Sequence, residues 1–441
     1  MSKNVVLITL DEVRPDHLSC YGYERIQTSN IDGVAKEGVR LETCITASNF
    51  TLPSHASILT GSYPPSHGLR EAYTPIQKET LAEILKIHGY LTAAFIGNPA
   101  LSSKLNFHRG FDYFEEHPPV DRYDGAFRVE VAEGENIALH QVRKAKGETF
   151  GNWWVRRAVE WIKNNRSRPF FVWGHIFDTH RIGEKRMFYN GWIKPGELSE
   201  FDYYDAKIKC VDERFIGELL NGLKELDLYD NTVLIIMSDH GTNLGEHPIP
   251  MGTFGESWGC TSPYPEHCTM YEHDIRVLCI IKDRDLPQGK VIEGITRTID
   301  IVPTVLELLD INVPVKFDGT SLIPYVERGE SPIEEAYIET LFESRNPGCL
   351  QAIRTKKYKF IRNLTHGVEA LYDLENDPRE VCNLLYNVEN FTISLEERQT
   401  LLYNWRKKMN EMLIKGPPER KVDLAVKEEI TKRLRQLGYL D

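Results

Sequence analysis

Acidic residues and histidines follow three separate apolar runs of the sequence, and their types suit a metal ion. These residues are Asp11, Glu12, Asp178, His180, Asp239 and His240. One acid after an apolar run is unremarkable, but three such segments supply both oxygen and imidazole ligands. Carboxylates combined with imidazole suit zinc or manganese, whereas oxygen ligands alone would favour calcium or magnesium. The sequence therefore predicts a divalent-metal site, with Zn or Mn favoured and Ca or Mg left open.

A hydroxyl that could act as a nucleophile lies in the stretch 48–61. Pro53 suits the first position of a helix and Gly61 its end, so Thr51 is expected at a helix N-terminus, where free amides favour anions. Taken alone, Thr51 is more simply explained as a helix cap. Beside a metal its hydroxyl is activated, because the ion stabilises the alkoxide. We therefore expect Thr51 to be the nucleophile and a metal ligand.

The apolar runs are typical of buried parallel strands, and helical segments alternate with them. The predicted strands are 5–10, 91–96, 170–177 and 232–237, and the predicted helices are 31–39, 80–89, 153–164 and 205–226. This alternation predicts an α/β fold with a large, mainly parallel sheet sandwiched by helices. Ligands of such sheets bind beyond the carboxyl ends of the strands, where the acids lie. His175, inside one strand, is expected to be a buried, hydrogen-bonded residue.

The pattern changes near residues 329–332, which predicts a domain boundary. Residues 1–330 would form the catalytic α/β domain, and residues 331–441 a small α+β domain. The second region is expected to contain short strands and two helices. These are strands at 337–340, 350–355 and 358–362 and helices at about 395–415 and 423–437.

Length, composition and charge describe an ordinary globular chain and exclude some partners. The 441 residues are 41% hydrophobic and 27% charged, which is enough apolar content for a large core. A net charge of −12 argues against binding to nucleic acid or to anionic membranes. Neither a signal-type apolar segment nor a run of transmembrane length is seen. We expect a cytoplasmic enzyme without a membrane span, and the sequence leaves a homo-oligomer open.

Blocks of sequence spread over nearly the whole chain resemble the sulfatase family of the alkaline-phosphatase superfamily. The stretch Thr51-Leu52-Pro53-Ser54-His55, followed by Thr60-Gly61, is similar to the family's nucleophile signature, Cys/Ser-x-Pro-Ser-Arg followed by Thr-Gly. Other matching blocks are 10–17, 20–23, 109–112, 238–241, 271–277, 298–304, 318–322, 352–360 and 371–378. The resemblance implies an alkaline-phosphatase-like fold with a smaller C-terminal domain, and hydrolysis of sulfate or phosphate esters.

The chain departs from this family's pattern at positions that matter for chemistry. Thr51 stands where sulfatases carry the cysteine or serine that becomes formylglycine, and it resembles the nucleophile of the superfamily's phosphodiesterases, nucleotide pyrophosphatases and phosphoglycerol transferases. The signature arginine is His55, and an expected lysine falls on His267. His180 matches the family's substrate-side histidine. A further lysine and histidine of the family are replaced by Asn98 and Ala100. Imidazoles thus replace fixed positive charges.

Two models of the site follow from the resemblance and the residue types. In the first, one metal is held by Asp11, Glu12, Asp239 and His240, while His180 and His267 contact the ester oxygens or protonate the leaving group. In the second, a further metal is held by Asp178, His180 and His267. We favour the first, because Asp178 and His180 are closer in sequence than in two-metal relatives. His55 is either a substrate contact or a packing residue.

The sequence therefore predicts a metal-dependent hydrolase in which Thr51 attacks a sulfate or phosphate ester, with phosphate mono- or diesters or phosphonates preferred. The expected substrate is a small anionic ester, such as a sulfated or phosphorylated sugar, a lipid head group or a nucleotide. Three alternatives stay open. They are a sulfuric ester hydrolase without formylglycine, a phospho-group transferase or mutase, and a non-catalytic relative that binds an anionic glycan or nucleotide.

Overall fold

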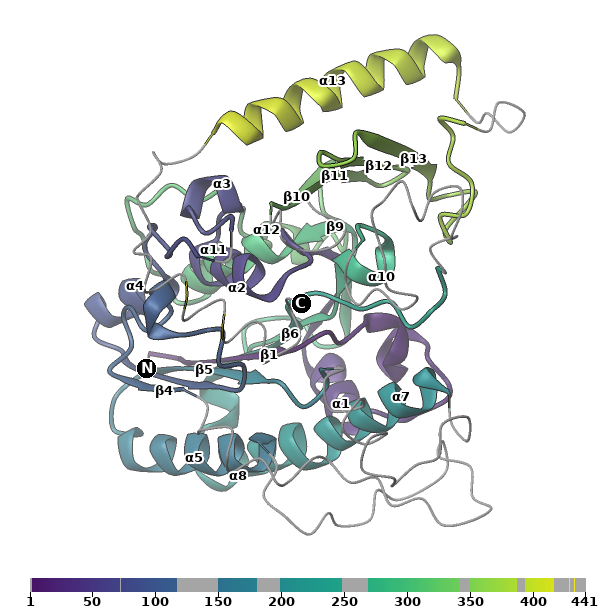
Figure 1. Cartoon of the computed structure of the whole chain (residues 1–441). Helices are drawn as coiled ribbons and strands as arrows, with labels where there is room; N and C mark the ends of the chain where they lie inside the picture. Colours follow the sequence, from purple (N-terminus) through teal and green to yellow (C-terminus); the bar gives the residue numbers. More distant parts are fainter. Residues whose placement is uncertain are drawn as a thin grey trace.

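The computed structural model describes most of the chain as two β-sheets with surrounding helices (Figure 1). The described residues are 2–71, 73–116, 150–180, 199–247, 269–341, 349–386 and 393–415, with the single positions 428 and 432. His267 and the helix predicted at 423–437 lie outside the described ranges, so their predicted roles and structure stay predictions.

Within the described residues, the larger sheet has nine strands, in the order β4-β3-β5-β1-β6-β8-β2-β7, with β9 beside β2. They are β1 (Asn4–Leu10), β2 (Val39–Ile45), β3 (Leu91–Ile96), β4 (Tyr113–Glu115), β5 (Phe170–Ile176), β6 (Thr232–Ser238), β7 (Arg276–Val277), β8 (Cys279–Lys282) and β9 (Lys290–Arg297). The first five strands in this order, β4, β3, β5, β1 and β6, are parallel to one another. Strands β7 and β8 are antiparallel to their neighbours. The sheet is therefore mixed, with the predicted parallel arrangement in the half that contains β1.

Helices cover both faces of this sheet, which confirms the predicted α/β architecture. One face of the sheet is covered by α1 (Ser29–Glu37), α5 (Phe150–Asn165), α7 (Glu200–Cys210) and α8 (Gly217–Glu225) (Figure 1). The other face is covered by α2 (Thr51–Thr60), α3 (Pro64–His67), α4 (Leu81–Ile87), α11 (Ile301–Leu308) and α12 (Ile323–Val326). Successive side chains of a strand point to opposite faces. Accordingly, Val5 and Leu7 pack into the α2 core, and Val6 and Ile8 into the α1 and α5 core.

Some element bounds differ from the sequence prediction. The helix expected at 205–226 is divided into α7 and α8 by a wider turn at Val211–Ile216. Strands β2 and β9 were not predicted, because they lack the continuous apolar run of β1. Short helical turns complete the fold at Pro15–His17, Ser19–Tyr21, Ser103–Leu105, Tyr229–Asn231, Glu272–Ile275 (α10) and Thr298–Asp300.

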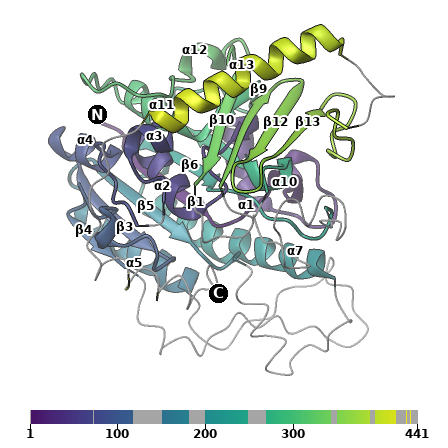
Figure 2. The same cartoon turned by 45° about the horizontal axis from the view of Figure 1, so that its top comes forward.

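The smaller sheet is antiparallel and lies between α13 (Leu395–Ile414) and the large sheet (Figure 2). Its strands are β10 (Glu335–Thr340), β11 (Leu350–Thr355), β12 (Tyr358–Asn363) and β13 (Val368–Asp373). Phe360 packs against Trp405 of α13, whereas Ile338 shares a core with Ile45 and Ile295 of the large sheet. The expected second sheet is present, and the boundary at residue 330 stays a prediction.

Strand β10 is also hydrogen-bonded to the segment that leads into α2. The backbone N–H of Glu339 donates to the carbonyl of Ala47 at 3.1 Å. The hydroxyls of Ser48 and Thr340 are 2.7 Å apart, and the Thr340 hydroxyl donates to Oδ1 of Asn49. The smaller sheet therefore helps to fix the residues that directly precede Thr51.

The packing of β5 against α5 gives a stability prediction. A Cβ added to Gly174 would lie 1.2 Å from Cζ2 of Trp154, so the Gly174→Ala variant must displace the buried indole. We expect Gly174→Ala to lower the free energy of unfolding by about 3 kcal/mol, measured by urea unfolding. Gly33→Ala in α1 is the control, because an added Cβ there meets nothing within 4 Å. Equal stability of the two variants would contradict the described packing.

Candidate metal and catalytic site

The strands β1, β5 and β6 bring the predicted acids to one edge of the large sheet. Leu10, the last residue of β1, lies opposite Ile176 of β5 and Ser238 of β6. Since the three strands are parallel, the residues that follow them emerge side by side. Asp11 and Asp239 are consequently neighbours in space although 228 positions separate them, and both are fully buried.

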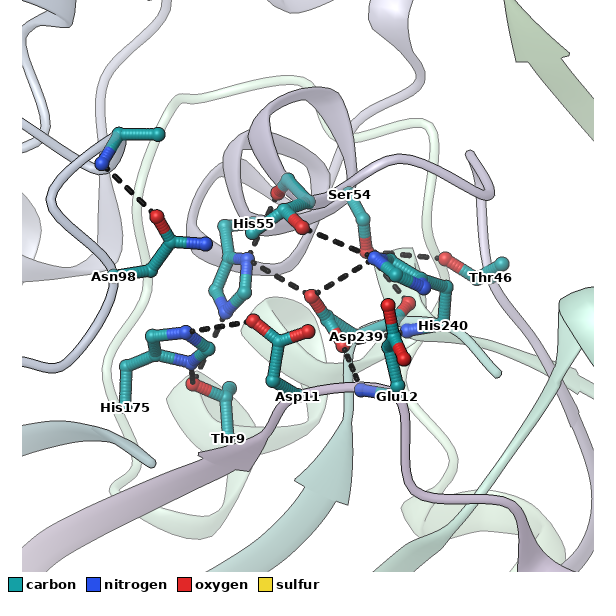
Figure 3. A network of polar contacts seen from close by, with 12 residues as sticks. Thr9, Asp11, Glu12, Thr46, Ser54, His55, Asn98, His175, Asp239 and His240 are labelled. Atoms are coloured by element: carbon teal, nitrogen blue, oxygen red, sulfur yellow. Dashed lines mark hydrogen bonds and ion pairs between the residues drawn. The ribbon is translucent and has the colours of Figure 1, made fainter. Parts of the chain in front are cut away.

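Two overlapping groups of ligand atoms lie at this edge, and Figure 3 shows Asp11, Glu12, Asp239 and His240 of them. In one group, atoms of Asp11, Glu12 and His180 are all within 4.8 Å of one another, and in the other the same holds for Asp11, Asp239 and His240. The sequence-predicted residue Asp178 belongs to neither group found in the described part of the chain. Asp11 is therefore shared, and the donors are the carboxylates and imidazoles expected for a divalent metal.

Glu12 holds an unusual backbone conformation at the end of β1. Its φ is 60°, in the left-handed region that is costly for residues other than glycine. Two contacts fix it there: its N–H donates to Oδ1 of Asp239 at 3.1 Å, and its carbonyl accepts from the hydroxyl of Tyr204. This turn places Oε1 of Glu12 3.2 Å from Nε2 of His180.

Burial and mutual repulsion disfavour ionised carboxyls in this cluster when no cation is present. Burial first, and then the charges of Asp239 and Glu12, raise the pKa of Asp11 well above its ordinary value. Burial raises the pKa of Asp239 to about 8. Hydrogen bonds from the backbone N–H groups of Glu12 and His240 act in the opposite direction and lower this pKa. Among the described residues, Oδ2 of Asp11 and Oδ2 of Asp239 find no hydrogen-bond donor. Two buried acceptors without donors, among imidazoles, fit a bound divalent cation.

The hydroxyl of Thr51 faces His240. Oγ1 of Thr51 lies 3.0 Å from Nε2 of His240, and Nδ1 of His240 lies 3.0 Å from the carbonyl of Gly241. A carbonyl only accepts hydrogen bonds, so Nδ1 carries a proton, and in the neutral ring Nε2 presents a lone pair to the Thr51 hydroxyl. Thr51 therefore donates to His240.

Thr51 is the first residue of α2, which begins two residues earlier than predicted. The N-cap is Phe50, and no side chain caps this end. Pro53 was expected to be the first residue of this helix, but it is the third. Proline is tolerated at the third position because the first four N–H groups of a helix have no partner within the helix. The hydroxyl of Thr51 thus does not cap the helix.

His55 lies beneath Thr51 and is fully buried. Its Nδ1 donates to the carbonyl of Thr51 at 2.8 Å, and its Nε2 lies 3.1 Å from the hydroxyl of Thr9. Burial lowers the pKa of the ring to about 4, so the imidazole is neutral. Both ring nitrogens are engaged by the protein, which favours the packing role of His55 over the substrate contact.

Two residues near the site were not predicted to belong to it. His175 is buried as expected, but its Nε2 lies 3.2 Å from Oδ2 of Asp11. Asn98, which follows β3, is also buried. A hydrogen bond from its side-chain amide favours the ionised carboxyl of Asp11 and so opposes the rise in the pKa of Asp11. The adjacency of β3, β5 and β1 brings these side chains together. No sequence spacing marks His175, whereas the resemblance places Asn98 where the family carries a lysine.

Comparison with known proteins first identifies the class of fold. A phosphonate monoester hydrolase of Agrobacterium radiobacter superposes with a TM-score of 0.68 at 20% identity, covering 93% of this chain and 95% of that one. A structure solved in complex with its substrate D-glucosamine-2-N,6-O-disulfate gives a TM-score of 0.70 at 20% identity, covering 96% and 100%. The chain has the fold of this group of hydrolases, as the resemblance implied.

The family follows from the sequence comparisons. The model of the sulfatase family matches residues 3–311, and that of the N-sulphoglucosamine sulphohydrolase C-terminal region matches residues 264–408. The chain therefore belongs to the sulfatase family, whose members are hydrolases. Relatives include an arylsulfatase of Clostridium perfringens (27% identity, covering 88% of this chain and 91% of the relative) and an N-acetylglucosamine-6-O-sulfatase of Bacteroides thetaiotaomicron (25%, 88% and 83%).

The raised pKa of Asp239 predicts how the metal-free protein responds to pH. In the unfolded chain Asp239 ionises near pH 4, whereas in the folded protein its pKa is about 8. Between about pH 4 and pH 8 the folded protein keeps a proton on Asp239 that the unfolded chain has lost, so the free energy of unfolding falls as the pH rises through this range. Between pH 7 and 8.5, above the titration of unfolded histidines, we expect chelator-treated protein to lose up to about 1.4 kcal/mol per pH unit for each proton, measured by urea unfolding.

Two variants and a metal-loaded sample control this measurement. Asp239→Asn should reduce the loss by the share of one proton, because the amide does not titrate, and Asp11, whose pKa is also raised, accounts for what remains. Asp230→Asn removes a carboxyl whose side chain is 97% exposed, and it should leave the loss unchanged. Protein loaded with Zn²⁺ should show no loss over the same range. A loss of the same size in Asp239→Asn and wild type would assign it to groups other than Asp239.

Proposed function

We propose that this sulfatase-family hydrolase uses Thr51 as a metal-activated nucleophile, with phosphate mono- or diesters or phosphonates as preferred substrates. The observation that carries the proposal is the 3.0 Å contact between Oγ1 of Thr51 and the lone pair on Nε2 of His240. Threonine has no part in formylglycine chemistry, whereas its alkoxide can attack phosphorus directly. The phosphonate monoester hydrolase among the structures of the same fold is in keeping with this preference.

The surrounding residues orient the attack. Thr51 opens α2, so the helix N-terminus favours an anionic ester beside the hydroxyl. Without a metal, Nε2 of His240 accepts the hydroxyl hydrogen; with a metal bound, the same lone pair would ligate the ion instead. His55 fixes the Thr51 backbone through the carbonyl. Complete burial of Thr51 and Asp239 keeps water from competing for these contacts.

A divalent metal completes the proposed mechanism. When bound, it would supply Lewis-acid polarisation of the ester and stabilise the Thr51 alkoxide. In the favoured one-metal model its ligands are Asp11, Glu12, Asp239, His240 and Thr51, with Zn or Mn preferred over Ca or Mg. His180 and His267 then contact the ester oxygens or donate a proton to the leaving group. The second model, with a further metal on Asp178, His180 and His267, is tested below.

Sulfuric ester hydrolysis without formylglycine is the second candidate. It is favoured by the relatives, which include an arylsulfatase, an N-acetylglucosamine-6-O-sulfatase and an ulvan-active sulfatase of Formosa agariphila. In either case we propose a small anionic ester as substrate and a cytoplasmic enzyme. No helix of the described ranges is long and apolar enough to cross a membrane.

Substitution of Thr51 tests the nucleophile. We expect Thr51→Ala to lower kcat/KM by about 10⁴-fold or more, because no other group replaces the attacking oxygen. Thr51→Ser keeps a hydroxyl and should retain measurable turnover. Thr60→Ala, at the other end of α2, is the matched control and should leave kcat/KM near the wild-type value. Turnover that survives in Thr51→Ala would disprove the nucleophile assignment.

A substrate panel separates the two candidate functions. Aryl phosphate, bis-aryl phosphate, aryl phosphonate and aryl sulfate are compared with protein of known metal content, supplied with Zn, Mn and Ca in turn. We expect the highest kcat/KM on a phosphorus ester with Zn or Mn. A higher kcat/KM on aryl sulfate would instead establish sulfuric ester hydrolysis by a threonine.

The number of metals is tested at His267. In the one-metal model, His267→Ala lowers kcat but leaves the metal content, measured by elemental analysis, at one ion per chain. In the two-metal model the same change lowers the metal content. We expect the first result.

A further inference from the structure

Helix α7 contacts both of the chain segments that supply the ligand group of Asp11, Glu12 and His180. Glu12 lies in the turn after β1 and His180 in the turn after β5, and their side chains are 3.2 Å apart. Tyr204 of α7 binds the backbone of the first turn, and Lys207 binds that of the second. Positions i and i+3 of a helix lie on one face, so a single face of α7 reaches both segments.

The Tyr204 hydroxyl binds the backbone on both sides of Val13. It donates to the carbonyl of Glu12 at 2.5 Å and accepts from the N–H of Arg14 at 2.7 Å, because a carbonyl only accepts and an N–H only donates. Glu12 has a φ of 60°, which is unfavourable for a residue that carries a Cβ. Tyr204 therefore stabilises the turn from which the Glu12 carboxyl extends.

Lys207 binds the backbone of the segment after β5. Its Nζ donates to the carbonyl of His180 at 2.9 Å, and only 3% of the Lys207 surface is exposed. The N–H of His180 in turn donates to the carbonyl of Phe177 at 3.0 Å, which closes a tight turn. Both backbone polar groups of His180 are thus held, so the direction in which its imidazole extends is fixed.

Helix α7 is itself anchored to the chain that follows the Glu12 turn. Oδ1 of Asp205 lies 2.7 Å from Nδ1 of His17, and Oδ2 of Asp205 accepts from the hydroxyl of Tyr23 at 2.7 Å. The ring of Tyr204 meets that of His17 edge to face, with centroids 4.9 Å apart. None of these contacts uses a ligand side chain, so the placement of α7 does not depend on a bound ion.

We propose that Tyr204 and Lys207 are positioning residues that hold the Glu12 carboxyl and the His180 imidazole in place. The proposal rests on the proposed function and extends it to the helix behind the site. The two residues act on different steps. Tyr204 acts through Glu12, a metal ligand, whereas Lys207 acts through His180, which contacts the ester. Loss of one contact should therefore weaken metal binding, and loss of the other should slow turnover.

Metal affinity tests Tyr204 without any measurement of turnover. Full-length protein is titrated with Mn²⁺, and separately with Zn²⁺, in competition with a chelator. We expect Tyr204→Phe, which keeps the ring, to bind both ions about 10-fold or more weakly. In a Glu12→Gln background the same change should add no further loss, because residues that act through one another are not additive. No loss, or an equal loss in both backgrounds, would overturn the role of Tyr204.

Steady-state kinetics test Lys207, with the aryl ester that gives the highest kcat/KM in the panel above. Lys207→Met keeps the aliphatic chain but not the donor, and we expect kcat/KM to fall about 10-fold or more. Mn²⁺ should bind no more weakly than to wild type, because loss of an ammonium group does not repel a cation. Lys207→Arg, which restores a cationic donor, should recover part of the turnover.

The His180→Gln background shows whether Lys207 acts through His180. There Lys207→Met should leave kcat/KM unchanged. An undiminished effect in that background, or wild-type kcat/KM in Lys207→Met alone, would overturn the role of Lys207. Tyr204→Phe removes a single oxygen atom, so it keeps the proposal falsifiable if Lys207→Met does not fold.

Matched controls lie near the opposite edge of the large sheet. The hydroxyl of Tyr229 donates to the Glu37 carboxyl at 2.6 Å, and the buried Nζ of Lys282 donates to the Tyr229 carbonyl at 2.7 Å. Tyr229 precedes β6, whereas the ligands follow the ends of their strands. Tyr229→Phe and Lys282→Met should keep wild-type Mn²⁺ affinity and kcat/KM. Losses as large as those of the test variants would indicate general destabilisation and overturn the proposal.

Failure of this proposal and failure of the proposed function give different results. If wild-type protein binds Mn²⁺ and Thr51→Ala abolishes turnover, but Tyr204→Phe and Lys207→Met match wild type, the positioning roles are wrong and the Thr51 mechanism stands. If wild-type protein binds neither Mn²⁺ nor Zn²⁺, the metal site itself is wrong and both proposals fall.

Discussion

Buried negative charge at the ends of β1 and β6 is the constraint on which the site depends. Asp11, Glu12 and Asp239 are brought together where water cannot solvate them, and an uncompensated cluster of this kind is costly. Ionised carboxyls are tolerated there only if a cation is bound. The hydroxyl of Thr51 faces His240, and the imidazole of His175 faces Asp11, so both side chains border the acid cluster.

The fold produces this concentration of charge by strand order. Because β1 lies between β5 and β6 and all three are parallel, residues far apart in sequence end at one edge. The interior of each strand is apolar and packs on both faces, which offsets the cost of the polar ends. The strained backbone of Glu12 is held by Asp239 and Tyr204, so the stable core maintains a local conformation that the turn alone would not adopt.

The sequence predicted those parts of the fold and site that have a local pattern. Continuous apolar runs located β1, β3, β5 and β6, and the acids at their ends were therefore placed correctly at one edge. Strand β2 and the position of His175 next to Asp11 depend on which strands become neighbours, and no local spacing encodes that. The tautomer of His240 likewise depends on the Gly241 carbonyl, which only the three-dimensional structure places beside the ring.

The contacts between β10 and the segment before α2 mean that the two sheets are not exchangeable modules. Thr340 and Glu339 bind Ser48, Asn49 and Ala47, only a few residues from Thr51. A smaller sheet transplanted from a relative would bring its own side chains to these positions and shift the start of α2. Side-chain changes at these positions of the smaller sheet therefore act directly on the segment that precedes Thr51.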